Sequence, residues 1–267
     1  MQPGNLEPCL VDAHVHLYSQ FAPADIVEAA STNFEHLASQ LDLPPQTPGL
    51  LLLSQTPGEH SPATLAASLA NDWQHAIIDD LGTLRLRHQN RPDLYIVPGW
   101  QVVSAEGLET LALVTPQAPK AGIDVSDALQ AVHDSDGLAV LPWGIGKWTG
   151  QRGQVIKRLI ESGNAKGVFF GDISGRLNLL PRPALLAMAE GRDHKVLAGT
   201  DPLPLAGEAQ KIGRFGFRAA FDPDQPSQSL KAWLRSAPQT PRTAGKTETL
   251  PRFLRLQLAM QINKRLK

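Results

Sequence analysis

The sequence lacks several features that would each define a class of protein. It has a single cysteine, Cys9, among 267 residues, which excludes a disulfide within the chain and fits a reducing compartment. No apolar run approaches the roughly 20 residues that a membrane-spanning helix needs. The opening, MQPGNLEPCL, has neither the basic flank nor the apolar stretch of a signal peptide. These absences predict a soluble cytoplasmic protein.

The chain also lacks an excess of charge of either sign. Its 25 lysines and arginines balance 26 aspartates and glutamates, for a formal net charge of -1. Overall electrostatics therefore give no reason to expect nucleic acid or an anionic membrane as a partner. With 42% hydrophobic and 19% charged residues, the composition is that of an ordinary globular protein. We expect a small-molecule substrate, and the sequence leaves the oligomeric state open.

Short apolar stretches alternate with segments of helical spacing along most of the chain. The predicted strands are residues 9–17, 50–54, 94–103, 109–115, 137–144, 167–172 and 195–201. The predicted helices are residues 25–41, 61–73, 126–132, 155–161, 184–191, 229–234 and 250–267. Repeated β-α alternation indicates a parallel sheet, and a chain of about this length favours closing that sheet into a barrel.

We therefore predict a TIM-like (β/α) barrel with seven or eight mostly parallel strands and a C-terminal helical extension. No shift in composition marks a domain boundary, so residues 1–267 are expected to form one domain. Residues 222–246 are rich in proline, serine and threonine and are expected to form an irregular surface excursion before the terminal helix at 250–267. Residues 109–115 are expected to pair with the strand at 94–103.

The first predicted strand carries an acid and two imidazoles on one face. In LVDAHVHL, Asp12, His14 and His16 are spaced two apart, and such side chains on a strand point the same way. Functional groups of a parallel barrel gather at the carboxyl ends of its strands, and a late strand, VLAGTDPLP, ends in Asp201. This spacing of an acid and two histidines is typical of a functional site. The alternatives are that the two histidines lie in the core and form hydrogen bonds with their neighbours, and that Asp201 is the N-cap of a helix.

The stretches VDAHVHL and VLAGTDPLP together resemble the metal-dependent amidohydrolase superfamily and the related PHP family (polymerase and histidinol phosphatase). Both families open with H-x-H on the first strand and place an aspartate at the end of a late strand. The resemblance implies that His14 and His16 are metal ligands, and that Asp201 is a ligand that also takes a proton from water. Imidazole and carboxylate suit a divalent ion, with zinc expected first and manganese or iron as alternatives. Asp12 is expected to orient one of the two rings.

The chain departs from both families elsewhere. Amidohydrolases usually add a histidine after each of two middle strands, where this chain has Trp143 and Asp172, and often a bridging lysine, for which Lys147 lies several residues too late. PHP proteins usually carry a glutamate after the third strand, where this chain has Gln101, and a late D-x-H, where it has Leu203. A single ion or a lost activity would account for these departures.

The glycine-rich stretch LPWGIGKWTGQRG is the other candidate for ligand contact, because glycines allow a backbone to approach a ligand closely. Trp143, Lys147 and Arg152, with Gln101 from an earlier strand, are predicted to bind substrate. The alternative is a turn whose tryptophans cover the barrel rim. Lys147 and Asp172 are predicted to join Asp201 in catalysis, although Asp172 can equally form an ion pair with Arg176.

The predicted activity is hydrolysis of a small polar substrate by metal-activated water, with amidohydrolase-like cleavage of a C–N bond. Two alternatives stay open: a PHP-like phosphoesterase, and a barrel that has lost its metal and binds a metabolite or a protein. A metal-independent lyase that uses Lys147 as a Schiff-base amine ranks last, because it leaves the two histidines without a role.

Overall fold

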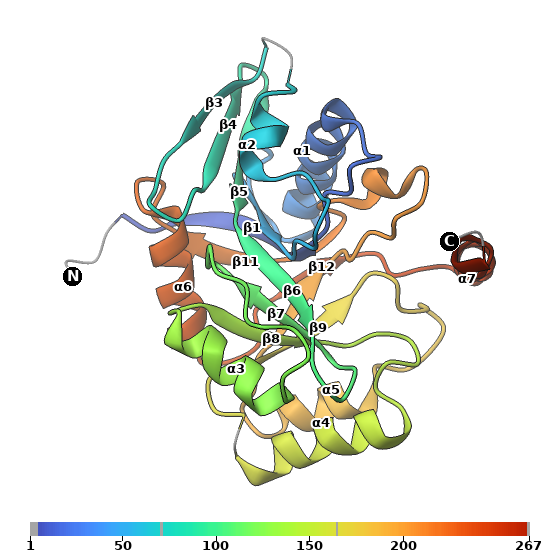
Figure 1. The fold of residues 1–267 in the computed structure, drawn as a ribbon. Helices are drawn as coiled ribbons and strands as arrows, with labels where there is room; N and C mark the ends of the chain where they lie inside the picture. Colours follow the sequence, from blue (N-terminus) through green and yellow to red (C-terminus); the bar gives the residue numbers. More distant parts are fainter. Residues whose placement is uncertain (1–4, 70–71, 164, 266–267) are drawn as a thin grey trace.

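The computed structural model describes residues 5–69, 72–163 and 165–265, which fold into two mixed β-sheets with helices packed against them (Figure 1). The larger sheet has seven strands, in the order β12 (Thr243–Gly245), β11 (Phe215–Phe221), β1 (Glu7–Val15), β2 (Gly49–Leu53), β5 (Arg91–Val97), β4 (Leu84–His88) and β3 (Gln74–Ile77). The smaller has five, in the order β10 (Val196–Gly199), β9 (Phe169–Ile173), β8 (Leu138–Pro142), β7 (Glu109–Leu113) and β6 (Gly99–Val103). The helices are α1 (Pro23–Gln40), α2 (Pro62–Ala66), α3 (Val125–Asp134), α4 (Gly150–Ser162), α5 (Ala184–Glu190), the 3-10 turn η1 (Glu208–Lys211), α6 (Pro226–Ser236) and α7 (Leu250–Arg265).

The prediction of a TIM-like barrel is wrong. Within the described ranges the strands form two separate sheets and no closed barrel, and the strand order is not that of a TIM barrel. β1, β2 and β5 run parallel, as do β8, β9 and β10, but β3, β4, β6, β7, β11 and β12 add antiparallel pairs. Apolar periodicity finds buried strands but does not give their direction, and it did not predict β3, β4, β11 and β12, the outer strands of the larger sheet, which pair antiparallel.

The stretch 94–103, predicted as one strand, is divided between the two sheets. β5 ends at Val97 in the larger sheet, and β6 begins at Gly99 in the smaller. Pro98 has no N–H to continue a ladder. A Cβ on Gly99 would lie 2.2 Å from the carbonyl oxygen of Leu53, so only glycine fits where the chain crosses between sheets. The expected pairing of the next stretch is confirmed, because β7 lies antiparallel to β6.

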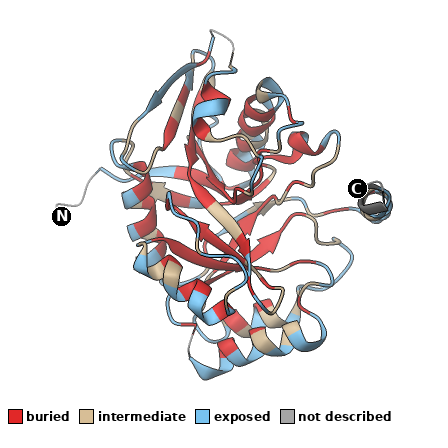
Figure 2. Cartoon of the chain, in the orientation of Figure 1, coloured by how far each residue is buried: buried red, intermediate tan, exposed pale blue. Residues whose placement is uncertain are grey.

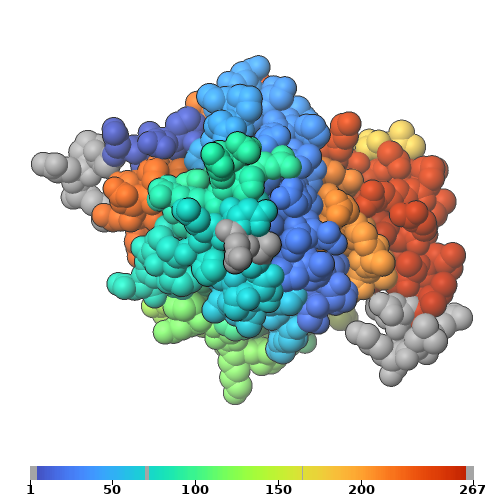
Figure 3. Space-filling model, turned by 90° about the horizontal axis from the view of Figure 1, so that it is seen from above, coloured from blue at the N-terminus to red at the C-terminus, as the bar shows by residue number. Residues whose placement is uncertain are grey.

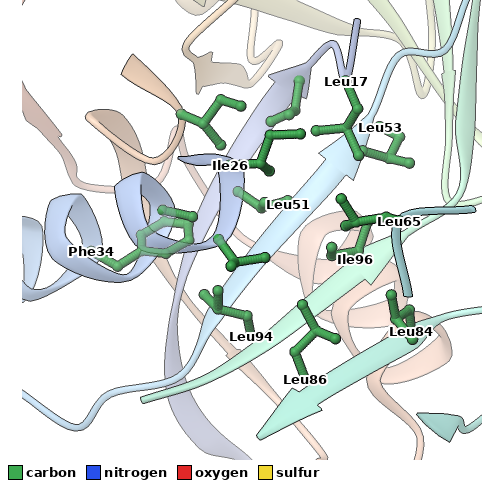
Figure 4. Packing of buried hydrophobic residues seen from close by; sticks show 14 of the residues in the cluster. Leu17, Ile26, Phe34, Leu51, Leu53, Leu65, Leu84, Leu86, Leu94 and Ile96 are labelled. Atoms are coloured by element: carbon green, nitrogen blue, oxygen red, sulfur yellow. The ribbon is translucent and has the colours of Figure 1, made fainter. Parts of the chain in front are cut away.

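Three groups of buried apolar side chains hold the layers together, and Figure 2 shows most strands buried along most of their length, with β3 exposed. α1 covers the larger sheet, where Ile26 and Phe34 pack beside Leu51 (Figure 4). A second group joins the two sheets, and a third lies between the smaller sheet and α3, α4 and α5. Burial of these groups from water is the main stabilising contribution to the arrangement that positions the strand ends.

The predicted C-terminal elements are changed in part. Residues 222–246 contain α6, which covers the helix predicted at 229–234, and the short strand β12, which was not predicted. Leu230 and Leu234, one helical turn apart, are buried in the group between the sheets and give α6 its apolar face. The terminal helix is present as α7, and the last two residues of its predicted range, 266–267, lie outside the described residues. Among the helices that the structure describes, none is both long and apolar enough for a membrane crossing.

Candidate metal centre

His14, His16 and Asp201 converge where β1 and β10 end. The Nε2 atoms of the two histidines are 3.3 Å apart. One carboxylate oxygen of Asp201, Oδ1, lies 3.5 Å from Nε2 of His14 and 3.9 Å from Nε2 of His16. In the described part of the chain, this is the group of three His, Cys, Asp or Glu side chains whose ligand atoms are close enough to share an ion. The three residues that the sequence predicted as ligands are therefore brought together.

The side chains present fit a divalent cation. Two nitrogens bound at 2.0–2.1 Å to one tetrahedral zinc are roughly 3.3–3.4 Å apart, which matches the two imidazoles. Nε2 of His14 also lies 3.2 Å from Oε1 of Gln101, so it has three polar neighbours: His16, Asp201 and Gln101. A ring nitrogen carries either one hydrogen or one lone pair, and it therefore cannot form a hydrogen bond with all three. Several acceptor atoms aimed at one point repel each other unless a positive charge lies among them.

Backbone contacts bring the late aspartate to the first strand. The N–H of Asp201 donates to the carbonyl oxygen of His14 at 2.8 Å. Gly199 makes this approach possible, because a Cβ there would lie 2.5 Å from the backbone nitrogen of His14. Asp201 has a φ of 49°, in the left-handed region that aspartate tolerates better than most residues. The turn after β10 thus directs this carboxylate at the two rings.

Asp12 holds the same turn from the other side. Its buried carboxylate accepts hydrogen bonds from Thr200 N at 2.7 Å, Thr200 Oγ1, Gly213 N at 2.9 Å and His14 N at 3.3 Å. Burial raises the pKa of Asp12 to about 7 in spite of these bonds. Asp12 was expected to orient a histidine ring, but its bonds go to backbone N–H groups and a hydroxyl. It therefore connects the first strand to the turn that carries Asp201.

The sequence analysis missed the partner of the second histidine. Oε1 of Glu59 lies 2.9 Å from Nδ1 of His16, on the far side of the ring from the proposed ligand atom. The ring of Tyr18 stacks on that of His16, with centroids 5.2 Å apart and planes tilted by 15°. Glu59 follows β2 by six residues, so a search for carboxylates that extended further past each strand would have found it. His60 is not part of the group, because its Nε2 lies against the carbonyl oxygen of Phe21.

The three candidate ligands have pKa values shifted in different directions. Burial lowers the pKa of His14 more than the charge of Asp201 raises it. Burial also acts to lower the pKa of His16, but the hydrogen bond and charge of Glu59, with Asp201, raise it overall. Burial acts to raise the pKa of Asp201, and the positive charges around it, with His14 first, lower it overall. The carboxylate and the neutral His14 ring are the forms that bind metal ions.

The predicted substrate-binding residues are found in different settings. Gln101 on β6 is at the centre, as its contact with His14 shows. Lys147 is engaged with Glu109 on β7, since its Nζ donates to both carboxylate oxygens at 2.6 and 2.5 Å. The charges of Glu109 and Lys147 also act on the pKa of His14, so the pair lies within electrostatic range of the centre. An ammonium held in an ion pair is not the free amine that the Schiff-base alternative requires.

The remaining candidates contact other parts of the molecule. Trp143 packs against the apolar group under α4 and α5. Arg152 donates to the carbonyl oxygens of Gly107 and Gly146 at 3.4 and 3.0 Å, and so connects two loops. Asp172 forms the alternative ion pair with Arg176, at 3.0 and 3.2 Å, and lines a separate cavity of about 310 Å³.

No family model matches the sequence, and no curated protein sequence matches it. Solved structures do match in fold. PsfC from Pseudomonas syringae PB-5123 has a TM-score of 0.52 and 16% identity, over 97% of this chain and 98% of that one. The lesion-specific endonuclease PfuEndoQ from Pyrococcus furiosus has a TM-score of 0.52 and 13% identity, over 90% of this chain and 59% of that one. At these identities the likeness concerns the fold alone: the chain shares its fold with PsfC and with an endonuclease.

Proposed function

We propose that the chain is a metal-dependent hydrolase in which His14, His16 and Asp201 hold one divalent ion. The observation that carries this is the convergence of their three ligand atoms, within 4.8 Å of one another, where β1 and β10 end. Two imidazoles and a carboxylate, with a further position open, are typical of catalytic zinc, so zinc is the first candidate and manganese or iron the alternatives. When bound, such an ion lowers the pKa of water toward neutrality and polarises an oxygen of the substrate.

The protein's own groups supply proton transfer and substrate placement. The second oxygen of the ionised Asp201 carboxylate is available to accept a proton from the attacking water. The side-chain amide of Gln101, whose oxygen is 3.2 Å from Nε2 of His14, offers an N–H that would orient a substrate oxygen. The Lys147 ammonium uses two of its three N–H donors on Glu109, so the third would be available to an anionic group of the substrate.

Two bond types are consistent with this arrangement. Cleavage of a C–N bond in an amide or cyclic amide follows from the amidohydrolase-like motif at His14 and His16. Cleavage of a phosphoester follows from the PHP-like reading and is supported by the shared fold with an endonuclease. Because the chain has a formal net charge of -1, a small substrate is favoured over a nucleic acid on either reading.

Metal analysis tests the proposal before any substrate is known. Protein stripped with a chelator should take up about one equivalent of zinc in a calorimetric titration, and the H14A/H16A double variant should take up none. Loaded protein is then assayed against a panel of cyclic amides and phosphomonoesters. Failure of the folded wild type to bind zinc, manganese or iron, or unchanged stoichiometry in the double variant, would rule the site out.

A binding module that has lost its metal is the second candidate. The side chains of His14 and His16 are only 4% and 3% exposed, which is little access for a reacting substrate. Trp143 and Asp172 stand where two middle strands would each supply another histidine. The same titration distinguishes the two candidates, because a binding module would take up no ion while still binding an organic ligand.

A further inference from the structure

The two histidines of the centre are held in different ways. Nδ1 of His14 is buried and has no hydrogen-bond partner among the described residues. Nδ1 of His16 faces Oε1 of Glu59 at 2.9 Å. An ionised carboxylate only accepts hydrogen bonds, so this contact requires a hydrogen on Nδ1 of His16. In the neutral ring, the lone pair is then on Nε2, the atom that faces His14 and Asp201.

Glu59 is fully engaged in that contact and its supports. The hydroxyl of Thr56 donates to Oε1 at 2.6 Å, and the backbone N–H of Leu17 donates to Oε2 at 3.2 Å. The Glu59 side chain is 2% exposed. With both oxygens bonded on the side of the ring away from Asp201, Glu59 is a support for His16 and not a fourth ligand.

The loop that carries Glu59 is fixed on both sides, to β6 and to the segment that follows β1. The backbone of Gln55 exchanges hydrogen bonds with β6, donating to Gly99 O at 3.0 Å and accepting from Gln101 N at 2.9 Å. The N–H of His60 donates to Leu17 O at 2.8 Å, and Nε2 of Gln55 donates to His60 O at 3.2 Å. Glu59 is therefore held in place before any ion arrives, which lowers the cost of ordering the ring.

We propose that Glu59, held by Thr56, is the positioning residue that fixes the tautomer and ring orientation of His16 and thereby strengthens metal binding. A ligating histidine whose other nitrogen bonds a carboxylate binds more tightly, and loss of such a partner costs about 10–100-fold in metal affinity. The effect on affinity rests on the proposed function, whereas the effect on the tautomer does not.

The test uses the full chain, zinc alone as the probe, and two measurements. The first is the zinc affinity of chelator-treated protein, by competition with a chromophoric chelator. The second is the tautomer of His16 in metal-free protein, from two-bond ¹H–¹⁵N correlations assigned by comparison with H16Q. E59A removes the acceptor, E59Q keeps an acceptor oxygen without the charge, and T56V removes one support. E28Q, at an exposed glutamate paired with Arg91, is the matched control.

We expect E59A to bind zinc about 10–100-fold more weakly and to lose the single Nδ1–H tautomer. E59Q should keep the tautomer and bind zinc with intermediate affinity. T56V should lose little zinc affinity, and E28Q should match the wild type in both measurements. Wild-type zinc affinity in folded E59A, or the same His16 tautomer in E59A and wild type, overturns the proposal. If E59A does not fold, E59Q is the deciding variant. Zinc affinity equal to that of the wild type would refute the role of Glu59, and weaker zinc binding would support it. If the wild type binds none of zinc, manganese and iron, the proposed function fails, and the tautomer comparison alone decides the role of Glu59.

Discussion

The backbone N–H of Asp201 donates to the carbonyl oxygen of His14 at 2.8 Å, which joins residues 187 positions apart at the end of the first strand. This bond, with those that Asp12 accepts from Thr200, fixes the carboxylate of Asp201 relative to both imidazoles. The candidate centre therefore depends as much on how two strand ends meet as on the ligand side chains.

Asp201→Asn should weaken zinc binding without disturbing the fold. The amide has nearly the shape of the carboxylate but no charge, and the backbone bond to His14 is kept. We expect a loss of affinity larger than the about 10–100-fold that an outer-shell partner contributes, measured by calorimetric titration. Asp172→Asn is the matched control, since Asp172 pairs with Arg176 instead. Equal zinc affinity in the two variants would contradict the assignment.

Gly199→Ala should damage both stability and the centre. Its new Cβ would lie 2.5 Å from the nitrogen of His14, so one strand end must shift. Such overpacking typically costs about 1–3 kcal/mol of the free energy of unfolding, which urea denaturation measures. Gly175→Ala is the comparison, because a Cβ there meets only Cδ1 of Ile173, at 3.4 Å. A loss in Gly199→Ala no greater than in Gly175→Ala would show that close approach is not required.

Lys211→Met should be among the most destabilising single changes. Nζ of Lys211 lies 2.6 Å from Glu208 and 2.8 Å from Glu248, and all three side chains are 2% exposed. Glu208 of this cluster also pairs with Arg252 of α7. The helix α7 lies at one edge of the molecule in Figure 3. Removing one partner of a buried ion pair leaves an uncompensated charge and costs about 3–5 kcal/mol, as read from urea denaturation.

The control for that change is Lys157→Met. Lys157 and Glu161 form an exposed pair at 3.7 Å, and such pairs contribute about 0–1 kcal/mol. If the two methionine variants lose similar stability, the buried cluster does not have the importance that its burial indicates.

Glu248 should make stability depend on acid pH. Burial acts to raise its pKa, but Lys211 and Arg214 lower the pKa overall, below its ordinary value of 4.5. A carboxyl group with a depressed folded pKa adds stability above its unfolded pKa, and that stability is lost as the pH falls through the folded pKa. The thermal midpoint should therefore fall as the pH drops below about 4.5, and less steeply in Glu248→Gln. Parallel curves for the two proteins would assign the acid sensitivity to other groups.

The sequence by itself determined the buried strands and the ligand types. Apolar runs located β1, β2, β8, β9 and β10, because a strand buried on both faces must be apolar along its length. Alternation on β1, and the motif resemblance, pointed to His14 and His16, and the polar residue after β10 pointed to Asp201. These predictions needed only local spacing, which a single strand fixes.

Only the tertiary structure decided the direction of the strands and the partners of the ligands. Strand direction depends on hydrogen-bonded neighbours and turns, so the antiparallel edges and the crossing at Pro98 turned an expected barrel into two sheets. Whether a polar side chain at a strand end contributes to a site depends on which residues from other segments pack against it. Asp172 and Arg152 found local partners, whereas Glu59, in a loop with no periodicity, came to lie against His16. Local pattern identifies residues that can bind an ion, and long-range packing selects those that meet.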